Sequence, residues 1–448
     1  MVDLPPEIWF NAIEFIPDYE LKKLISVNSA FLEAGMNRKW QRTTIYMCSA
    51  AEMPILKRMS DPFVAERVKL LRIHLHFNTP RNPRPNDPTF EDCMDALLEA
   101  VPLLRNAYDF KFAFQYFPSS FDMKQWIQSL CHSLAPNSGN VQALALAGSS
   151  EDLQAFTESM PPLSQLQDLK INFLNTCDDY TDVPASAHHL ASPIVYFING
   201  ISLNLRSLEI WCGYDVNLSE IFKNLIGMPT LHNLDIQLSR FAPLCEPSEL
   251  FCFLERCSDS LRNLELRLAQ DTLDHWFSDI RVDASENHFL LNLHSLSIVT
   301  SVRTRAVDII TQFLQKTSTT LQKLDLQKTN LYEFISTPMF NDEELSRIVD
   351  AAAHCIQLQY LRVRIECLND HVLDMLASKF PALQTFSVTA ESIPIIGLRG
   401  GTLVSDEVYI MPNGKVYQQW KFRNIRITRY YANRISYTAL VDKILAIE

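Results

Sequence analysis

Glycine is scarce in this chain, with ten residues among 448. Loops that hold a phosphate group need glycine, because the backbone must come close to the ligand. The sequence also contains no Walker-type phosphate loop, no G-x-S-x-G turn and no H-E-x-x-H helix. We therefore expect no enzyme activity, no cofactor and no metal. An enzyme that uses dispersed loop residues stays open as an alternative, because catalytic triads are recognised by geometry and not by sequence position.

Long apolar runs and paired cysteines are lacking too. No stretch approaches the roughly 20 apolar residues that a membrane-spanning helix needs. The first residues are neither basic nor followed by an apolar run, so we expect no signal peptide. The ten cysteines include no C-x-x-C pair, which disfavours a zinc site and favours a reducing compartment. We expect an intracellular protein, cytoplasmic or nuclear, that does not bind membranes.

Positive charge is in short supply, with 40 Lys and Arg against 52 Asp and Glu and a formal net charge of −12. Binding to a phosphate backbone depends on clustered cations. The nearest thing to a basic cluster lies near the C-terminus and consists of Lys421, Arg423, Arg426, Arg429 and Arg434. Alternating strands with solvated arginines explain this cluster more simply than RNA does, so nucleic acid is not an expected partner.

The first forty residues predict short amphipathic helices. Pro5 and Pro6 suit the first turn of a helix, and Pro17 prevents its continuation. A second helix is predicted from Tyr19, with Asp18 as its cap. Apolar residues recur at helical spacing along both, at Ile8, Ala12, Ile13, Phe15 and Ile16, then Leu21, Leu24, Ile25, Phe31 and Leu32. A segment this small needs a partner or the following domain to cover part of its apolar surface.

An L-x-x-L-x-L pattern recurs through the middle of the chain. Its copies are Val141/Leu144/Leu146, Leu166/Leu169/Ile171, Leu205/Leu208/Ile210, Leu231/Leu234/Ile236, Leu261/Leu264/Leu266, Leu293/Leu296/Ile298, Leu321/Leu324/Leu326, Leu358/Leu361/Val363 and Leu383/Phe386/Val388. Their mean spacing of roughly 30 residues is close to that of leucine-rich repeats. Val68/Leu71/Ile73 is a degenerate earlier copy, and Phe110, Phe112 and Phe114 indicate another strand whose register the sequence does not fix.

Each repeat predicts a short strand followed by a helix. Val307, Ile310, Phe313 and Leu314 form one helical stripe, and Asn341 with Glu344 predicts a capping box at the start of another helix. Strands joined by crossover helices pair in parallel. Because no single repeat can bury its own apolar face, we expect an α/β fold in which the repeats stack as a leucine-rich-repeat solenoid, or horseshoe, with a strand-lined concave side.

These patterns divide the chain into four parts. We expect a helical segment at 1–45, a connecting segment at 46–64, the solenoid at 65–394 and a C-terminal cap at 395–448. Proline-rich or polar insertions interrupt the solenoid near 78–89 and 175–192. The cap is expected to be rich in β-structure, because residues 408–422 read as a hairpin that turns at Asn413-Gly414.

The N-terminal segment resembles an F-box, through the order Leu4-Pro5-x-Glu7-Ile8, then Asp18-x-x-Leu21, then Val27 and Phe31. Followed by leucine-rich repeats, it makes the whole chain resemble the F-box/leucine-rich-repeat proteins, particularly those of fungal type with irregular repeats. The resemblance implies a substrate receptor of a cullin-based ubiquitin ligase that docks a Skp-type adaptor and, through it, a cullin. The adaptor contacts that it implies are Leu4, Pro5, Glu7, Ile8, Ile13, Leu21 and Leu24.

Contacts with an unknown target protein are expected from strand positions that flank the inward leucines. These positions are Glu209, Trp211, Asp235, Gln237, Glu265, Arg267, Asp325 and Gln327, with Arg362 and Arg364 further along. The acids would attract a basic segment, Trp211 would serve as an aromatic anchor, and the two later arginines would bind an acidic or phosphorylated motif. The alternative is an interaction scaffold, independent of ubiquitin, whose N-terminal helices cap the solenoid and bury Leu4, Ile8 and Leu24 against it.

Overall fold

The computed structural model describes residues 5–46, 52–76, 88–115, 122–174, 191–214, 218–241, 247–268, 290–300, 306–317, 319–328, 339–392, 424–429 and 437–441. The chain divides into two compact units, Met1–Leu205 and Arg206–Glu448. None of the described helices is both long and apolar enough to cross a membrane.

The first unit begins with three helices, where the sequence predicted two: α1 (Pro6–Glu14), α2 (Asp18–Leu24) and α3 (Ser29–Trp40). The predicted second helix is broken because Asn28 has an extended backbone and its side chain accepts a hydrogen bond from the Phe31 N–H at 3.0 Å. This bond makes Asn28 the N-cap of α3. Asp18 is the first residue of α2 and not its cap, since Pro17 holds the cap position.

The rest of the first unit alternates strands and helices. Its strands pair in parallel in the order β1-β2-β3-β4-β5. The strands are β1 (Arg42–Tyr46), β2 (Leu70–His76), β3 (Asp109–Gln115), β4 (Ala143–Gly148) and β5 (Asp168–Phe173). The helices are α4 (Met53–Met59), α5 (Pro62–Ala65), α6 (Phe90–Ala100), α7 (Met123–Leu134), α8 (Ser150–Ser159) and α9 (Ala191–Ile201), with 3₁₀ turns at η2 (Val101–Leu103) and η3 (Ala135–Asn140).

The second unit continues the same alternation. Strands β6 to β13 pair in parallel in chain order, and β14 pairs antiparallel with β13. The strands are β6 (Ser207–Tyr214), β7 (Asn233–Phe241), β8 (Asn263–Leu268), β9 (Ser295–Thr300), β10 (Lys323–Lys328), β11 (Tyr360–Cys367), β12 (Thr385–Ser392), β13 (Asn424–Arg429) and β14 (Tyr437–Val441). The helices are α10 (Leu218–Asn224), α11 (Pro247–Arg256), α13 (Ala306–Lys316), α14 (Asp342–Ala351) and α15 (Asp370–Lys379).

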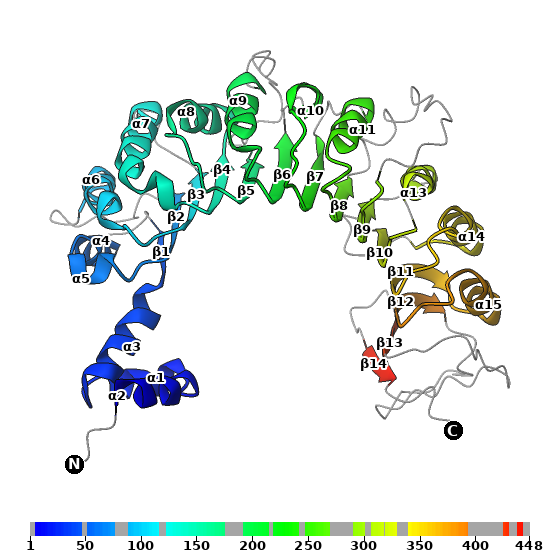
Figure 1. The fold of residues 1–448 in the computed structure, drawn as a ribbon, viewed down its shortest axis with the longest axis horizontal. Coiled ribbons are helices and arrows are strands. Elements are labelled where there is room, and N and C mark those ends of the chain that lie inside the picture. Colours follow the sequence, from blue (N-terminus) through cyan, green and yellow to red (C-terminus); the bar gives the residue numbers. More distant parts are fainter. Residues whose placement is uncertain are drawn as a thin grey trace. The chain divides into compact units, whose positions relative to one another are not determined.

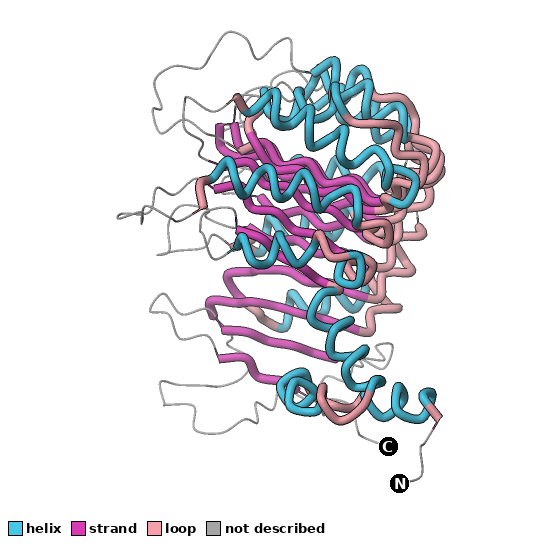
Figure 2. The backbone as a smooth tube through the Cα atoms, turned by 90° about the vertical axis from the view of Figure 1, so that its left-hand side faces the viewer, coloured by secondary structure: helices cyan, strands magenta, loops and turns pink. Residues whose placement is uncertain are grey.

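In each unit the helices between strands form a layer on one side of the sheet (Figures 1 and 2). We call the opposite side the open face. The repeat leucines point toward the helices and are buried, as in β4 and β9, where every second residue is buried and the others are partly exposed. This confirms the predicted solenoid-like α/β repeat with parallel strands. The structure also establishes the register of the strand that contains Phe110, Phe112 and Phe114. Phe110 pairs with Leu71, and Phe112 pairs with Ile73.

A backbone motif marks the start of most repeats. The carbonyl of Tyr108, for example, accepts hydrogen bonds from the N–H groups of Gln142 at 2.8 Å and Ala143 at 2.9 Å in the next repeat. The same doubly bonded carbonyl recurs at Gln41, Lys69, Gln142, Arg206, His232, Arg262, His294, Gln322 and Gln359. Since most strands start from an equivalent atom, they begin in the same register as their neighbours.

Side chains in the turns before the strands add a second link between repeats. An amide or hydroxyl of one turn donates a hydrogen bond to a backbone carbonyl of the preceding repeat. The pairs are Asn106 to Glu66, Asn140 to Arg105, Asn204 to Ser164, Ser260 to Met228, Asn292 to Asp259 and Thr320 to Leu291, at 2.7–2.9 Å. These bonds satisfy carbonyls that the strands leave unpaired.

Polar side chains also set where several helices begin. The predicted capping box of Asn341 and Glu344 is confirmed at the start of α14, and Thr89 with Asp92 and Ser149 with Asp152 form equivalent boxes at α6 and α8. The predicted stripe of Val307, Ile310, Phe313 and Leu314 is buried on α13.

The sheet extends past both ends predicted for the solenoid. β1 pairs with β2 although it starts at Arg42, before residue 65, and β13 pairs in parallel with β12 although it lies beyond residue 395. Most of the predicted insertions at 78–89 and 175–192, and the hairpin predicted at 408–422, lie outside the described residues.

Candidate functional site

The three N-terminal helices have a hydrophobic core of their own. Ile13 and Leu21 are 3% and 2% exposed and pack with Ala30, Phe31 and Ala34 of α3. Trp9, Ile16 and Leu24 are partly buried against this cluster, and the rings of Trp9 and Phe31 lie 5.4 Å apart. All eight residues come from α1, α2, α3 and the turn after α1, so these helices are held together by mutual packing.

Large apolar side chains remain exposed around this core. Phe15 is 86% exposed and Ile8 is 49% exposed. We define the N-terminal apolar surface as these two residues together with Phe10, Tyr19, Ile25, Val27 and Leu32, all of which are exposed. Several large exposed apolar side chains on one short segment are a common mark of a protein interface.

The predicted adaptor contacts do not all lie on that surface. Ile8 belongs to it, and Pro5 and Glu7 are exposed next to it in the sequence, whereas Leu4 is outside the described residues. Ile13 and Leu21 point inward because helical periodicity places them on the face that meets α3, so they support the helices and do not face a partner. Leu24 packs against the same core.

Arg38 of α3 connects all three helices. Its guanidinium donates hydrogen bonds from Nη1 to the carbonyl of Ile16 and from Nη2 to the carbonyl of Ile13, both at 2.6 Å. Nη1 also lies 3.0 Å from Oδ1 of Asp18. The carbonyl of Ile13 also accepts the N–H of Ile16 at 3.0 Å, so Arg38 adds a charged donor to the turn that ends α1.

We expect Arg38→Gln to loosen the three helices. A glutamine side chain is shorter and carries no charge, so it cannot replace the two charged hydrogen bonds to the carbonyls of Ile13 and Ile16. A hydrogen bond that involves a charged group contributes about 1.5–3 kcal/mol to the free energy of unfolding. Hydrogen exchange followed by mass spectrometry should show faster exchange in α1 to α3 and no change in β2 to β5. Asp18→Asn is the matched control and should have little effect, since the Asp18 side chain is 77% exposed and surface ion pairs contribute little. Unchanged exchange in Arg38→Gln would contradict this role.

The predicted target-binding residues lie on the open face of the second unit. Glu209, Asp235 and Glu265 are in register across β6, β7 and β8, and Trp211, Gln237 and Arg267 form the next row. Asp325 and Gln327 occupy the corresponding positions on β10, and Arg362 lies in register with Asp325 on β11. The structure therefore brings the predicted side chains onto one surface.

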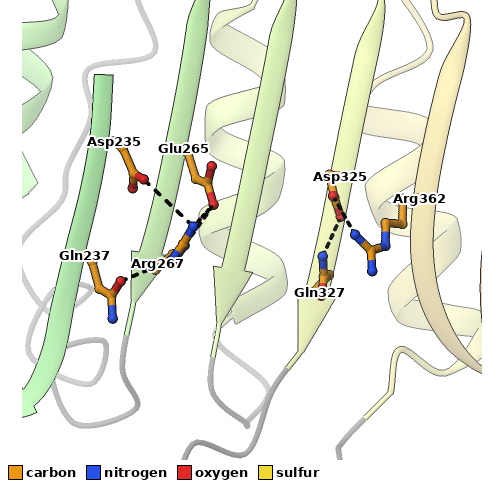
Figure 3. Close-up of polar contacts among 7 residues, drawn as sticks. All are labelled: Asp235, Gln237, Glu265, Arg267, Asp325, Gln327 and Arg362. Carbon is orange, nitrogen blue, oxygen red and sulfur yellow. Dashed lines mark hydrogen bonds and ion pairs between the residues drawn. The ribbon is translucent and has the colours of Figure 1, made fainter. Parts of the chain in front are cut away.

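Arg267 is the centre of the first group on this surface (Figure 3). Its Nη2 lies 2.7 Å from Oε1 of Glu265 and 3.8 Å from Oδ2 of Asp235, and its Nη1 donates to Oε1 of Gln237 at 3.2 Å. Burial lowers the pKa of Arg267, but its hydrogen bond to Glu265 and the three neighbouring carboxylates outweigh that effect and raise the pKa overall. The guanidinium thus partly neutralises the acids around it.

Arg362 plays a similar part in the second group. Its Nη1 lies 3.5 Å from Oδ2 of Asp325, whose Oδ1 accepts a hydrogen bond from Nε2 of Gln327 at 3.0 Å (Figure 3). Arg364 donates to the carbonyl of Lys328 at 3.4 Å. Two of the predicted arginines therefore lie beside carboxylates that were predicted to attract a basic segment.

One cysteine and one histidine lie close together in the second unit. Nε2 of His354 is 3.5 Å from Sγ of Cys355 and 2.9 Å from the carbonyl oxygen of Thr317. Burial raises the pKa of Cys355, and its bond with the Thr317 hydroxyl only partly opposes that shift. A nucleophilic cysteine needs a lowered pKa, so this pair is not arranged as an activated nucleophile. Across the described ranges, no three His, Cys, Asp or Glu side chains converge to hold a metal ion.

A further candidate surface, not predicted from the sequence, lies on the open face of the first unit. There Arg72 of β2 and Lys111 of β3 lie in register, with the stacked rings of Tyr46 and His74 beside them. The signal was present, since these residues alternate with the buried Leu71, Ile73, Phe110 and Phe112.

No family model matches the chain, and no curated protein matches it. Among solved structures, the crystal structure of the yeast Rad7 and Elc1 complex matches 92% of this chain and 97% of that chain, at 13% identity and a TM-score of 0.39. A crystal structure of a Bacteroides fragilis protein matches 70% of this chain and 72% of that chain, at 14% identity and a TM-score of 0.32. At these TM-scores neither likeness bears on the function of this chain.

Proposed function

We propose that this chain is the substrate-recognition subunit of an SCF-type cullin-RING ubiquitin ligase. Helices α1 to α3 act as an F-box that docks a Skp-type adaptor, and the repeats bind the target protein. The observation that most supports the proposal is the N-terminal apolar surface. The three helices already share a core, so the exposed apolar side chains do not hold the segment together and are available to a partner.

The alternative, a scaffold whose N-terminal helices cap the solenoid, predicts a different environment for Ile8 and Leu24. It requires Ile8 and Leu24 to be buried against the repeats. Ile8 is half-exposed, and Leu24 packs on the core of the N-terminal helices themselves. Both observations favour a docking segment over a cap.

In this role the chain performs no bond chemistry itself. It holds the target on an assembly that also carries the ubiquitin-loaded conjugating enzyme. Tethering raises the effective concentration of target lysines at that enzyme, and such proximity alone can account for a large acceleration.

We place the target on the open face of the second unit. Glu209, Asp235 and Glu265 form a row of acids beside Arg267, and a basic segment of the target would complement this row. Trp211, in the next row, is the aromatic anchor of this surface. Arg362 and Arg364 are expected to meet an acidic part of the target, in exchange for their present bonds to Asp325 and Lys328.

The test is co-purification of the full-length chain with a Skp-type adaptor. The intact chain should retain the adaptor, and a variant with Ile8→Asp and Phe15→Asp should bind it at least about tenfold more weakly, since central apolar contacts of an interface often contribute 2 kcal/mol or more each. The matched control is Tyr196→Asp with Leu203→Asp. These residues are 83% and 71% exposed in the first unit but lie outside the N-terminal helices.

Circular dichroism must show that all variants are folded. Loss of the adaptor only in the N-terminal variant supports the proposal. If the intact chain does not retain the adaptor, or if both variants retain it equally, the proposal fails and the scaffold becomes the better interpretation.

A further inference from the structure

Two cations stand side by side on the open face of the first unit. Arg72 and Lys111 are in register on neighbouring parallel strands, which places their backbones about 4.8 Å apart. Within the described part of the chain, neither side chain has an ion-pair partner within 4.0 Å. This differs from the second unit, where Arg267 and Arg362 are both paired with carboxylates. We call Arg72 and Lys111 the cation pair.

The cation pair stands on a chain in which acids outnumber bases by twelve. The acid that lies nearest in the strand pattern is Asp109, one row away on β3. It feels the charges of both Lys111 and Arg72, which lower its pKa, but burial raises the pKa by more. No ion pair within 4.0 Å joins Asp109 to either cation, so the cation pair keeps its capacity for an external anion.

An aromatic pair lies beside the cations. The rings of Tyr46 and His74 are stacked, with centroids 4.9 Å apart and planes inclined by 13°. Tyr46 is half-exposed, and it lies in register with His74 two residues beyond the Thr44 and Arg72 pair. Burial and the charge of Arg72 lower the pKa of His74, which favours its neutral ring. The stack is thus a flat, largely uncharged surface on which an apolar side chain can pack.

On the other side of Lys111 the neighbouring strand β4 carries small side chains on the open face. Ala143, Ala145 and Ala147 of β4 are partly exposed and lie in register with Asp109, Lys111 and Ala113. Their methyl groups leave the backbone of an approaching chain free to come close to the sheet. Cations, aromatic rings and small side chains together suit an extended peptide.

We propose that the open face of β1 to β4 binds an extended acidic segment of a partner protein, whose carboxylates pair with Arg72 and Lys111 while an apolar side chain packs on Tyr46 and His74. The surface shares no residue with the N-terminal apolar surface or with the open face of the second unit. The proposal therefore holds whether or not the chain binds an adaptor.

The arrangement of the charges favours carboxylates over other anions. Arg72 and Lys111 present one positive charge per strand in a row and not a cluster that converges on a single point. A row of single charges fits several monoanionic carboxylates of an extended chain, in which side chains on one face recur every two residues. A long polyanion such as RNA needs clustered cations along its phosphate backbone, and the cation pair supplies only two charges.

Fluorescence anisotropy with the full-length chain tests this proposal. The probe is a labelled peptide of alternating glutamate and alanine with one central tryptophan. Comparison probes replace each glutamate with glutamine, replace one glutamate with phosphoserine, or consist of single-stranded poly-uridine RNA. We expect the glutamate peptide to bind, the glutamine peptide not to bind, and affinity to fall as salt is raised.

The variant Arg72→Glu with Lys111→Glu should weaken binding of the glutamate peptide at least about tenfold, because it places like charges opposite the ligand. The control Lys57→Glu with Arg58→Glu makes the same charge change on α4 of the same unit, at two exposed side chains, and should leave binding unchanged. Far-ultraviolet circular dichroism and urea midpoints must agree among the three proteins. If the cation-pair variant does not fold, Arg72→Gln with Lys111→Gln replaces it.

Three results would overturn the proposal. The first is no binding of the glutamate peptide by the intact chain, and the second is equal loss of binding in both variants or in neither. The third is preference for another probe: binding of the phosphoserine peptide alone would assign the surface to phosphorylated segments, and tighter binding of RNA would assign it to nucleic acid.

Discussion

Phe112→Ala is expected to destabilise the first unit by about 3–5 kcal/mol, the usual cost of deleting a buried phenylalanine. Phe112 is 1% exposed and lies between Phe110 and Phe114, with ring centroids 6.1 Å and 6.4 Å away. Phe156 of α8 packs against it at 5.5 Å. Truncation would leave a cavity between sheet and helix that several rigid rings cannot fill. Urea denaturation followed by circular dichroism should show a much lower midpoint for the transition of this unit.

The matched control changes the preceding residue of the same strand. Lys111→Ala should alter stability by no more than about 0.5 kcal/mol, because the side chain points to the open face and has no ion-pair partner among the described residues. A loss below about 1 kcal/mol in Phe112→Ala would contradict the inward orientation of β3. Since repeats contribute nearly independently, the comparison uses the transition of this unit and not a single global value.

The strands of the solenoid could be predicted where leucine or a similar residue fills every inward position. β1 escaped prediction because only Thr43 and Ile45 point inward from it, and a threonine reads as a surface residue. In the structure Thr43 is 5% exposed, and its hydroxyl donates to the carbonyl of Trp40 at 2.9 Å. A buried polar group needs such a partner, and the partner depends on how α3 enters the strand. Sequence periodicity carries no information about that geometry.

The N-terminal helices show a second limit of periodicity. The spacing of Leu21, Leu24 and Phe31 is compatible with one continuous helix, so the break between α2 and α3 was missed. Asn28 decides the matter locally, because its side chain caps α3 and its backbone is extended. Asparagine is a weak helix former and a strong N-cap. The spacing of apolar residues does not show whether Asn28 lies within a helix or caps the next one.

The candidate surfaces were predictable as positions but not as contacts. Alternation along each strand identified the outward side chains, and their registers in β6 to β8 are those that stacked repeats require. The ion pairs of Arg267 with Glu265 on the same strand and with Asp235 on the neighbouring strand depend on the conformation of the arginine side chain. Alternation along the strands does not predict that conformation. The sequence therefore predicted acids and an arginine on one surface, whereas the structure shows that two of the carboxylates share this arginine.

A buried ion pair in the second unit gives the other large expected effect. Lys328→Met or Glu344→Gln should each lower the stability of this unit by about 3–5 kcal/mol, because removal of one partner leaves the other charge poorly compensated. Nζ of Lys328 lies 2.6 Å from Oε2 of Glu344, and the two side chains are only 5% and 15% exposed. The same ammonium donates to the carbonyl of Met339 at 3.2 Å and lies 4.6 Å from the ring centroid of Phe340. Urea midpoints measure the loss.

The double variant separates charge burial from packing. Lys328→Met with Glu344→Gln removes both charges and keeps an acceptor for the N–H of Asn341, which Oε2 of Glu344 holds at 3.0 Å in the capping box. We expect it to recover most of the lost stability, because a buried pair often adds little net free energy over neutral side chains of similar size. Lys379→Met is the exposed control: its ion pair with Asp350 at 3.1 Å is 40% and 61% exposed and should contribute less than about 1 kcal/mol. If the double variant were as unstable as the two single losses added together, the pair would not act as a coupled unit, and α14 would be held to β10 by other contacts.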